Sequence, residues 1–323
     1  MKLLYRLALF FIVQFGVLTN SVWADKYFST KPMRFVSAMA AGGSGDINAR
    51  RLADALRMRL GNQVVVDNRA GGGGNLAAVI AANANPDGFT LFFASEQIFT
   101  VNPTITPKLP FNLEDFRPLI LVSKTPHILL VSNASSSHTL SELIQFSKSN
   151  PGPLHFGSGG IGTSPHLAGE WFKGLASIKL VHVPYRGASL SLSALMSNEI
   201  QLLFDSTLTA LGHIHSGRAR GLAIASQNRS PLIPELPTFT ESGYPKFDVG
   251  VTHGLLLPVA TPASISENLN KILNEVLIET EYKKKMTDVG AQVVGGSPQY
   301  FHDYLVSERK KWAEVIAKQK ITF

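Results

Sequence analysis

Three glycine-rich turns, each placed between a short apolar run and a helical pattern, constrain the fold of this chain more than any other feature. They occupy residues 40–45, 71–74 and 159–163. Glycine lets the backbone turn sharply and lets its N–H groups approach a ligand, so such turns are typical of the edge of an open α/β sheet. β-type and helical runs alternate from residue 33 to 94 and again after residue 126. Strands are predicted at residues 33–39, 64–66, 90–94, 128–131 and 249–257. The predicted helices include residues 139–148, which open with the capping pair Thr139 and Glu142, and residues 298–318. This rhythm predicts an α/β fold built on doubly wound sheets flanked by helices.

The length of 323 residues and a hydrophobic fraction of 45% suit two closely joined lobes with sizeable cores. No low-complexity linker divides the chain into independent domains. We expect one lobe at residues 25–123 plus 250–323 and the second lobe at residues 124–249, with crossovers near Lys124 and Asp248. Two short crossovers form a hinge, and a hinge between α/β lobes creates a cleft for a ligand.

The first 24 residues carry the pattern of a secretory signal peptide. Lys2 and Arg6 supply a positive start, residues 7–18 are almost entirely apolar, and Val22 and Ala24 suit a cut after position 24. A membrane anchor is the alternative, but the apolar run rises only about 18 Å as a helix, against a hydrocarbon core of about 30 Å. We therefore expect export to the periplasm and a soluble mature protein.

Composition excludes several other classes of protein. The chain has no cysteine, which excludes disulfide scaffolds, thiolate metal sites and a lipid-anchored N-terminus. His213 and His215 lie in a helical stretch, where positions two apart point in different directions, so we expect no metal pair. Neither a dinucleotide fingerprint nor a phosphate loop is present, and we expect no cofactor. The basic residues are scattered without interleaved aromatic residues, so we expect no nucleic-acid partner.

The turn after the first strand is the first candidate binding loop. Ligands of open α/β sheets bind beyond the carboxyl ends of strands, where backbone N–H groups and a helix dipole favour an anion. The candidate binding residues of this loop are Ala40, Ala41, Gly42, Gly43, Ser44 and Asp46. Asp46 has a structural alternative, because an aspartate here caps the helix and satisfies its free N–H groups.

The second candidate binding loop has the same anion-binding physics in the other lobe. Its candidate residues are Ser158, Gly159, Gly160, Ile161, Gly162, Thr163 and His166. His166 has the alternative of a buried, hydrogen-bonded histidine. The third candidate, Asp205, ends a predicted strand and is able to accept from a ligand amine or hydroxyl, or else to cap the next helix.

A hydrolytic triad of Ser158, His166 and Asp205 is the enzymatic alternative. Nothing in the spacing of these residues supports it, and the chain has no nucleophile-elbow motif. We therefore expect a binding protein with no catalytic residues.

Longer motifs are spread over almost the whole mature chain. They include Gly42-Gly43-Ser44-Gly45-Asp46, Asp67-Asn68-Arg69-Ala70-Gly71, Pro86-Asp87-Gly88-Phe89, His166-Leu167-Ala168-Gly169-Glu170, Val183-Pro184-Tyr185-Arg186-Gly187 and Gly254-Leu255-Leu256-Leu257-Pro258. In this order and spacing, the chain resembles the periplasmic solute-binding receptors of tripartite tricarboxylate transporters, the Bug or TctC-type family.

The resemblance implies a two-lobed periplasmic binding protein of type II, a Venus flytrap whose lobes are mixed sheets flanked by helices. It implies that a small carboxylated molecule is captured in the cleft and delivered to a permease of two integral membrane subunits. Residues 40–44 and 158–163 match loops that hold a carboxylate in this family through backbone groups and ordered water. Asp205 matches an acidic position that often faces the site.

Two positions depart from the family pattern. Ala40 and Ala41 stand where a large residue and a proline are usual, so we expect a wider pocket. Thr252 and His253 stand where an aromatic residue is common, and His253 is able to hydrogen-bond a ligand. We expect a monomer. The functional alternatives are a receptor that feeds a membrane sensor instead of transport, and an exported α/β hydrolase.

Overall fold

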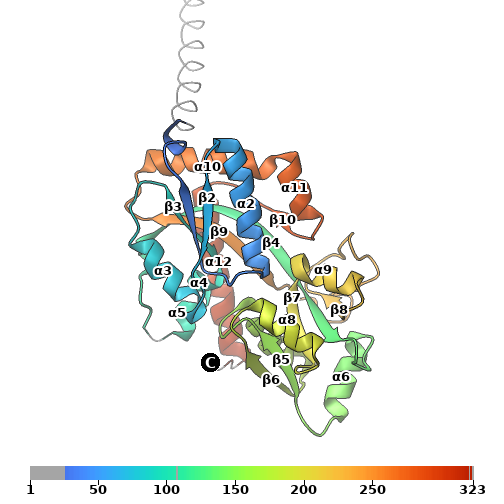
Figure 1. Ribbon diagram of the computed structural model, residues 1–323. Coiled ribbons are helices and arrows are strands. Elements are labelled where there is room, and N and C mark those ends of the chain that lie inside the picture. Colours follow the sequence, from blue (N-terminus) through green and yellow to red (C-terminus); the bar gives the residue numbers. More distant parts are fainter. Residues whose placement is uncertain (1–25, 107, 320, 322–323) are drawn as a thin grey trace, which may run out of the picture.

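The computed structural model describes residues 26–106, 108–319 and 321. The predicted signal peptide lies outside the described residues. The chain forms two lobes, which lie one above the other in Figure 1. Within the described residues, no helix is both long enough and apolar enough to cross a membrane.

Lobe 1 is built on a mixed sheet with the strand order β2-β1-β3-β9-β4. The parallel strands are β1 (Met33–Ser37), β2 (Val64–Asn68) and β3 (Thr90–Ser95), whereas β9 (Gly250–Pro258) is antiparallel to β3 and β4. The short β10 (Gln292–Val293) pairs with β4. The predicted strands of this lobe are confirmed to within a few residues.

Helices cover both faces of the lobe 1 sheet. On one face lie α2 (Ser44–Leu60), α10 (Ala263–Ile278) and α11 (Thr280–Thr287), and on the other lies α3 (Asn75–Ala82). Alternate residues of one strand enter different cores: Phe93 packs with α2 and α10, and Phe92 packs on the opposite side. A strand buried on both faces reads as a continuous apolar run, as residues 90–94 do.

Lobe 2 is built on the strand order β4-β7-β5-β6, with β8 beside β4. Its strands are β5 (Leu154–Ser158), β6 (Leu180–Pro184), β7 (Leu202–Ser206) and β8 (Ala219–Ile224). Its helices are α6 (Leu140–Ser149), α7 (Ser164–Ala176), α8 (Ala188–Met196) and α9 (Thr207–His215). The predicted cap of α6 is confirmed, because the Thr139 hydroxyl accepts from the Glu142 N–H at 3.1 Å.

A single long strand, β4 (Phe116–Ser132), passes through both lobes (Figure 1). It pairs with β9 as far as Pro126 and with β7 from His127 onward. The sequence predicted only its second half, residues 128–131. The first half was not predicted because it contains Pro118 and Pro126, and proline is unfavourable inside a strand. In the structure a register shift follows Pro118, and Pro126 lies where β4 changes its pairing partner from β9 to β7.

The C-terminal helix α12 (Pro298–Gln319) is a further connection between the lobes (Figure 1). Phe301 and Leu305 pack into lobe 1, whereas Trp312 and Ile316 pack into lobe 2. The last turns of α12 therefore contact the core of lobe 2, and the assignment of residues 250–323 to lobe 1 stays a prediction. An amphipathic pattern marks a helix's apolar side but does not say which core each turn meets.

Candidate functional site

A cavity of about 810 Å³ lies between the lobes, over the carboxyl ends of the parallel strands. Predicted site residues from both lobes line it: Ala40, Gly43, Ser44, Gly159, Gly160, Ile161, Thr163, Asp205 and His253. The remaining predicted residues are not among those that line it: Ala41, Gly42, Asp46, Ser158, Gly162 and His166. The structure thus brings both predicted loops, Asp205 and His253 to one cavity.

Asp46 supports the first loop from behind. Its carboxylate accepts from Gly42 N–H at 2.9 Å, Arg50 Nε at 3.0 Å and Asn68 Nδ2 at 2.9 Å. Burial opposes ionisation, but these hydrogen bonds outweigh it and hold the pKa of Asp46 below its usual value. Asp46 therefore has a structural role, as the alternative to ligand contact predicted. Its carboxylate holds the loop before α2 and does not cap that helix.

Two stacked histidines support the second loop. His166 Nδ1 accepts from Gly162 N–H at 3.1 Å, and its ring lies 3.9 Å from that of His182. His182 Nε2 in turn lies 2.6 Å from Ser158 Oγ. Burial lowers the pKa of His166 to about 3 and that of His182 to about 4, so both rings are neutral. Ser158 is therefore paired with His182, and the hypothetical triad with His166 is not assembled.

Asp205 lies at the end of β7 and is 4% exposed. Its Oδ2 accepts from the Thr209 hydroxyl at 2.7 Å. Burial raises the pKa of Asp205 to about 6, against the opposing effect of hydrogen bonds from Thr209 and Ser206. The helix-capping alternative for Asp205 is wrong, because the side chain that caps α9 is Ser206, which accepts from Leu208 N–H.

Two buried histidines lie on the strands that cross between the lobes. His253 on β9 stacks on Phe93 at 5.3 Å, and its Nδ1 lies 3.2 Å from Asn48 Nδ2. His127 on β4, which the sequence analysis missed, places Nε2 2.6 Å from Ser164 Oγ. Burial lowers the pKa of each ring to about 4, so both are neutral at pH 7. Nothing in the sequence distinguished His127 from a core residue of its strand.

The glycine turn at residues 71–74 also lines the cavity, together with Asn102 and Ile105, which the sequence analysis missed. Gly71, Gly72, Gly73 and Gly74 all have positive φ, and Asn102 Nδ2 donates to Gly73 O at 3.0 Å. Asn102 belongs to α5 (Asn102–Ile105), which follows α4 (Gln97–Thr100). The signal for the turn was present, since it follows a strand and precedes a helix as the other two do.

The lobes touch on two sides of the cavity. A Cβ on Gly187 of lobe 2 would lie 2.9 Å from Ala40 Cβ of lobe 1. A Cβ on Gly162 of lobe 2 would lie 2.5 Å from Ile105 Cδ1 of lobe 1. Real Cβ atoms do not come this close, so small residues at both places permit the lobes to close over the cavity.

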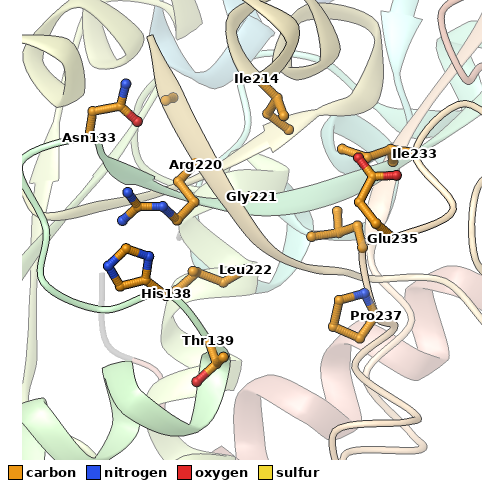
Figure 2. Close-up of a pocket in the computed structure, with 12 residues that line it drawn as sticks. Asn133, His138, Thr139, Ile214, Arg220, Gly221, Leu222, Ile233, Glu235 and Pro237 are labelled. Atoms are coloured by element: carbon orange, nitrogen blue, oxygen red, sulfur yellow. The ribbon is translucent and has the colours of Figure 1, made fainter. Parts of the chain in front are cut away.

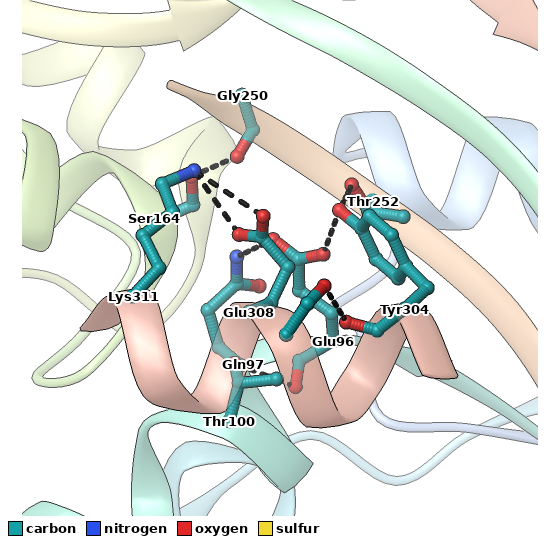
Figure 3. A network of polar contacts seen from close by, with 10 residues as sticks. Glu96, Gln97, Thr100, Ser164, Gly250, Thr252, Tyr304, Glu308 and Lys311 are labelled. Carbon is teal, nitrogen blue, oxygen red and sulfur yellow. Dashed lines mark hydrogen bonds and ion pairs between the residues drawn. The ribbon is translucent and has the colours of Figure 1, made fainter. Parts of the chain in front are cut away.

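A polar network lies behind Gln97, one of the cavity-lining residues (Figure 3). Gln97 Nε2 donates to Glu96 Oε1 at 3.2 Å, and the Tyr304 hydroxyl donates to Glu96 Oε2 at 2.5 Å. Burial and the neighbouring Glu308 raise the pKa of Glu96 to about 7. Through Tyr304, the network connects the cavity wall to α12. On the same helix, Lys311 Nζ forms an ion pair with Glu308 at 3.1 Å.

A smaller cavity of about 430 Å³ lies within lobe 2, between β8 and the loops beside it (Figure 2). Arg220 and His138 lie close together in it, with Glu235 on the opposite side (Figure 2). The Arg220 guanidinium already donates to the carbonyls of Ser135 and Ser137 at 3.1 and 3.2 Å. Its charge is therefore engaged in holding that loop, and the interlobe cavity remains the candidate site.

No group of three or more potential metal ligands among His, Asp and Glu is clustered in the described part of the chain. The described residues that line the interlobe cavity supply backbone loops, neutral histidines and one carboxyl group.

Comparison with known proteins agrees with this description. The family model of the tripartite tricarboxylate transporter family receptor matches residues 48–321. A UPF0065 protein from the tcbD-tcbE intergenic region of Pseudomonas sp. is 32% identical, over 96% of this chain and 93% of its own length. The protein BugT of Bordetella pertussis is 31% identical, over 95% of this chain and 94% of its own.

Solved structures share the fold. The periplasmic binding protein BugD is 29% identical with a TM-score of 0.86, over 91% of this chain and 99% of its own. An R. palustris protein with adipate is 28% identical with a TM-score of 0.88, over 91% and 98%. MatC from Rhodopseudomonas palustris with bound malate is 28% identical with a TM-score of 0.81, over 88% and 99%. The expected fold of a two-lobed periplasmic binding protein is confirmed, and the chain belongs to the tripartite tricarboxylate transporter receptor family as a Bug or TctC-type solute-binding protein.

Proposed function

We propose that this receptor captures a small carboxylated molecule in the interlobe cleft and delivers it to a tripartite tricarboxylate-type permease of two membrane subunits. It acts in the periplasm as a monomer without catalysis, after removal of residues 1–24. The relatives with adipate and malate support the class of ligand, since both ligands are dicarboxylates.

One observation carries the proposal: two helix N-termini from opposite lobes meet at the same cavity. Helix α2 begins beside Gly43 and α7 beside Thr163, and no side chain of the described residues caps either helix. The first N–H groups of a helix need an acceptor, and together with the helix dipole they favour an anion. Ser44 and Ser164 of these first turns line the cavity.

A carboxylate held between the lobes would link ligand capture to lobe closure. Each oxygen of the carboxylate accepts two hydrogen bonds, so one group is able to satisfy donors from both loops. A ligand that contacts both lobes binds the closed form more tightly and shifts the population toward it. The closed form is then the signal that the permease reads.

A thermal-shift screen of the ligand-stripped protein against small carboxylic acids and neutral controls tests this function. A ligand at 100 times its Kd adds about 2.7 kcal/mol of stability. For a chain of this size this raises Tm by several degrees, at about 2–4 °C per kcal/mol. The proposal predicts a shift with at least one acid and none with the neutral controls. Absence of any shift with acids, on protein shown by mass spectrometry to be free of ligand, would contradict it.

Delivery to a permease needs a separate test in cells. Deletion of the gene is expected to abolish uptake of the identified acid. Unchanged uptake with a lost transcriptional response to that acid would instead assign the receptor to a membrane sensor.

A further inference from the structure

The first turn of α9 is a part of lobe 2 that is buried against lobe 1. Leu208 belongs to the hydrophobic core of lobe 1, where it lies in one cluster with Met286 and Ala291. Ala210 and Leu211, further along the same helix, belong instead to a core of lobe 2. The helix therefore begins in the core of one lobe and continues in that of the other.

A buried hydrogen bond fixes the same turn. Thr207, the first residue of α9, is fully buried, and its hydroxyl donates to the carbonyl of Gly290 at 3.0 Å. Gly290 lies on the turn between α11 and β10 of lobe 1, and α9 lies beside this turn (Figure 1). The fit is close, because a Cβ on Gly290 would lie 2.9 Å from Thr207 Oγ1. Removal of a hydroxyl that is shielded from water leaves its acceptor unpaired.

This contact lies outside the cavity and is connected to both of its walls. In lobe 2, Thr207 directly follows Ser206, which lines the cavity, whereas neither Thr207 nor Leu208 is among the described residues that line it. In lobe 1, α11 is held against α2 through the Lys285 carbonyl, which accepts from Arg51 Nη1 at 2.7 Å. Helix α2 begins at the first glycine loop of the cavity. The contact therefore sets the position of one wall relative to the other.

The same contact is present while the lobes also touch across the cavity. Gly187 of lobe 2 meets Ala40 of lobe 1 on one side. Gly162 meets Ile105 on the other side. The first turn of α9 adds a third contact between the lobes, made by groups of this chain alone. The chain thus supplies part of the free energy of closure, and a ligand has to supply correspondingly less.

We infer that Thr207 and Leu208 are positioning residues for ligand capture, which brace lobe 2 against the turn between α11 and β10 and raise the population of the closed cleft. The inference rests on the proposed function, because closure serves capture. The apparent Kd of a receptor equals its intrinsic Kd divided by the fraction of molecules in the binding-competent form. Loss of the brace lowers this fraction and weakens every ligand by the same factor.

Thr207→Val and Thr207→Ser separate the hydroxyl from the shape of the side chain. Valine has the shape of threonine without its hydroxyl, whereas serine keeps the hydroxyl. Isothermal titration calorimetry uses succinate, malate and adipate as probes. Thr207→Val is expected to weaken each acid that the wild type binds by the same factor of about 3 to 10, the usual net effect of one hydrogen bond. Thr207→Ser should stay within about twofold of the wild type.

Leu208→Ala tests the apolar part of the brace, and Leu143→Ala is its matched control. Both leucines are buried on helices of lobe 2, but Leu143 packs into a core of its own lobe. Both variants should have a lower Tm, because each loses a buried side chain. Only Leu208→Ala is expected to weaken Kd, by about tenfold. Circular dichroism establishes that the variants are folded, and Thr207→Val tests the brace even where Leu208→Ala does not fold.

The distance between the lobes tests the brace without a ligand. The chain has no cysteine, so spin labels attach only at Leu76→Cys of lobe 1 and Val181→Cys of lobe 2, both at exposed positions. Double electron–electron resonance on the ligand-free protein is expected to show a larger share of long distances in Thr207→Val and Leu208→Ala than in the wild type and Leu143→Ala.

Two results would overturn the inference while leaving the carboxylate receptor intact. One is an unchanged distance distribution in the folded Thr207→Val protein, and the other is a Kd for that variant as tight as the wild type or tighter. Failure of the wild type to bind any acid of the wider carboxylate panel would instead contradict the proposed function itself.

Discussion

At the scale of single residues, Gly43 is placed where any side chain would enter the contact between the lobes. Its φ of −82° is open to all residues, so a substitution there leaves the backbone unstrained. A Cβ at this position lies 3.7 Å from Ala188 Cβ of lobe 2, and the two further methyl groups of valine extend into that contact.

We predict that Gly43→Val weakens ligand binding by at least tenfold, a change of about 1.4 kcal/mol, without lowering Tm. The reason is that valine keeps the lobes apart instead of unfolding lobe 1. Calorimetric titration and a thermal scan measure the two effects. Gly152→Val is the matched control, because a Cβ at Gly152 meets nothing within 4 Å. Equal affinity in a folded Gly43→Val protein would remove this loop from the site.

Asp46 gives a prediction on stability and pH. Asp46→Ala removes a buried carboxylate that accepts hydrogen bonds from Gly42 N–H and Asn68 Nδ2, so we expect a loss of about 1–3 kcal/mol in the free energy of unfolding, measured in urea. The pKa of Asp46 is lowered in the folded chain, so its contribution is present above the unfolded pKa near 3.8 and is lost as pH falls through the lower folded value. Asp54→Ala on the exposed face of the same helix should cost far less.

The sequence was most informative at this scale where chemistry is local. Glycine turns, a helix cap and the acid at the end of β7 each carry their own signal, and the structure brings Gly43, Gly159 and Asp205 to one cavity. His127 and Gln97 were missed because their roles depend on which strands and helices become neighbours. A histidine in an apolar run carries the same local pattern whether it faces a core or a cleft.

At the scale of elements, the joint between β3, β9 and α12 contains a buried carboxyl group that titrates near neutrality. Burial and Glu308 raise the pKa of Glu96 to about 7 from its usual 4.5. Between pH 4.5 and pH 7, Glu96 is therefore protonated in the folded chain and ionised in the unfolded chain. The free energy of unfolding falls as pH rises through this range.

We predict that Glu96→Gln removes the contribution of this joint to the pH dependence of the free energy of unfolding between pH 4.5 and 7. At pH 8 the variant should be more stable than the wild type by up to about 3 kcal/mol, since one pKa unit corresponds to about 1.4 kcal/mol. The amide keeps an acceptor for the Tyr304 hydroxyl. Urea unfolding at several pH values measures the slope. A variant that is less stable than the wild type at pH 8 would contradict this account of the joint.

The sequence analysis described two elements incompletely, for a physical reason. The first half of strand β4 contains two prolines, which disfavour a strand locally, so it was not predicted. In the structure, pairing with β9 and β7 stabilises the whole strand. Helix α12 was predicted as a helix, but the amphipathic pattern is silent on which lobe each turn contacts. Local propensity thus predicts the existence of an element better than its partners.

At the scale of the whole molecule, α12 and β4 join two lobes whose cores are separate. Trp312 near the end of α12 is 1% exposed and lies 5.9 Å from Trp171 of lobe 2, whereas Phe301 at its start packs in lobe 1. A helix anchored in both cores couples their unfolding.

We predict a single calorimetric unfolding transition for the wild type. Trp312→Ala should destabilise the protein by about 3–5 kcal/mol, the usual cost of removing a buried tryptophan. This lowers Tm by on the order of 10 °C. Phe146→Ala, at a 43%-exposed position of α6, is the control and should change Tm little. Two well-separated transitions in the wild type would show that α12 does not couple the lobes.

The central claim is that an anion occupies the cleft between the two lobes. Calorimetric titration of the ligand-stripped protein, with a carboxylic acid and its uncharged primary amide in parallel, tests it most directly. We predict one acid bound per chain and at least a tenfold weaker interaction with the amide, because the helix N-termini of α2 and α7 favour a negative charge. Equal affinity for the acid and its amide would contradict the account, since the cleft would then recognise shape without charge.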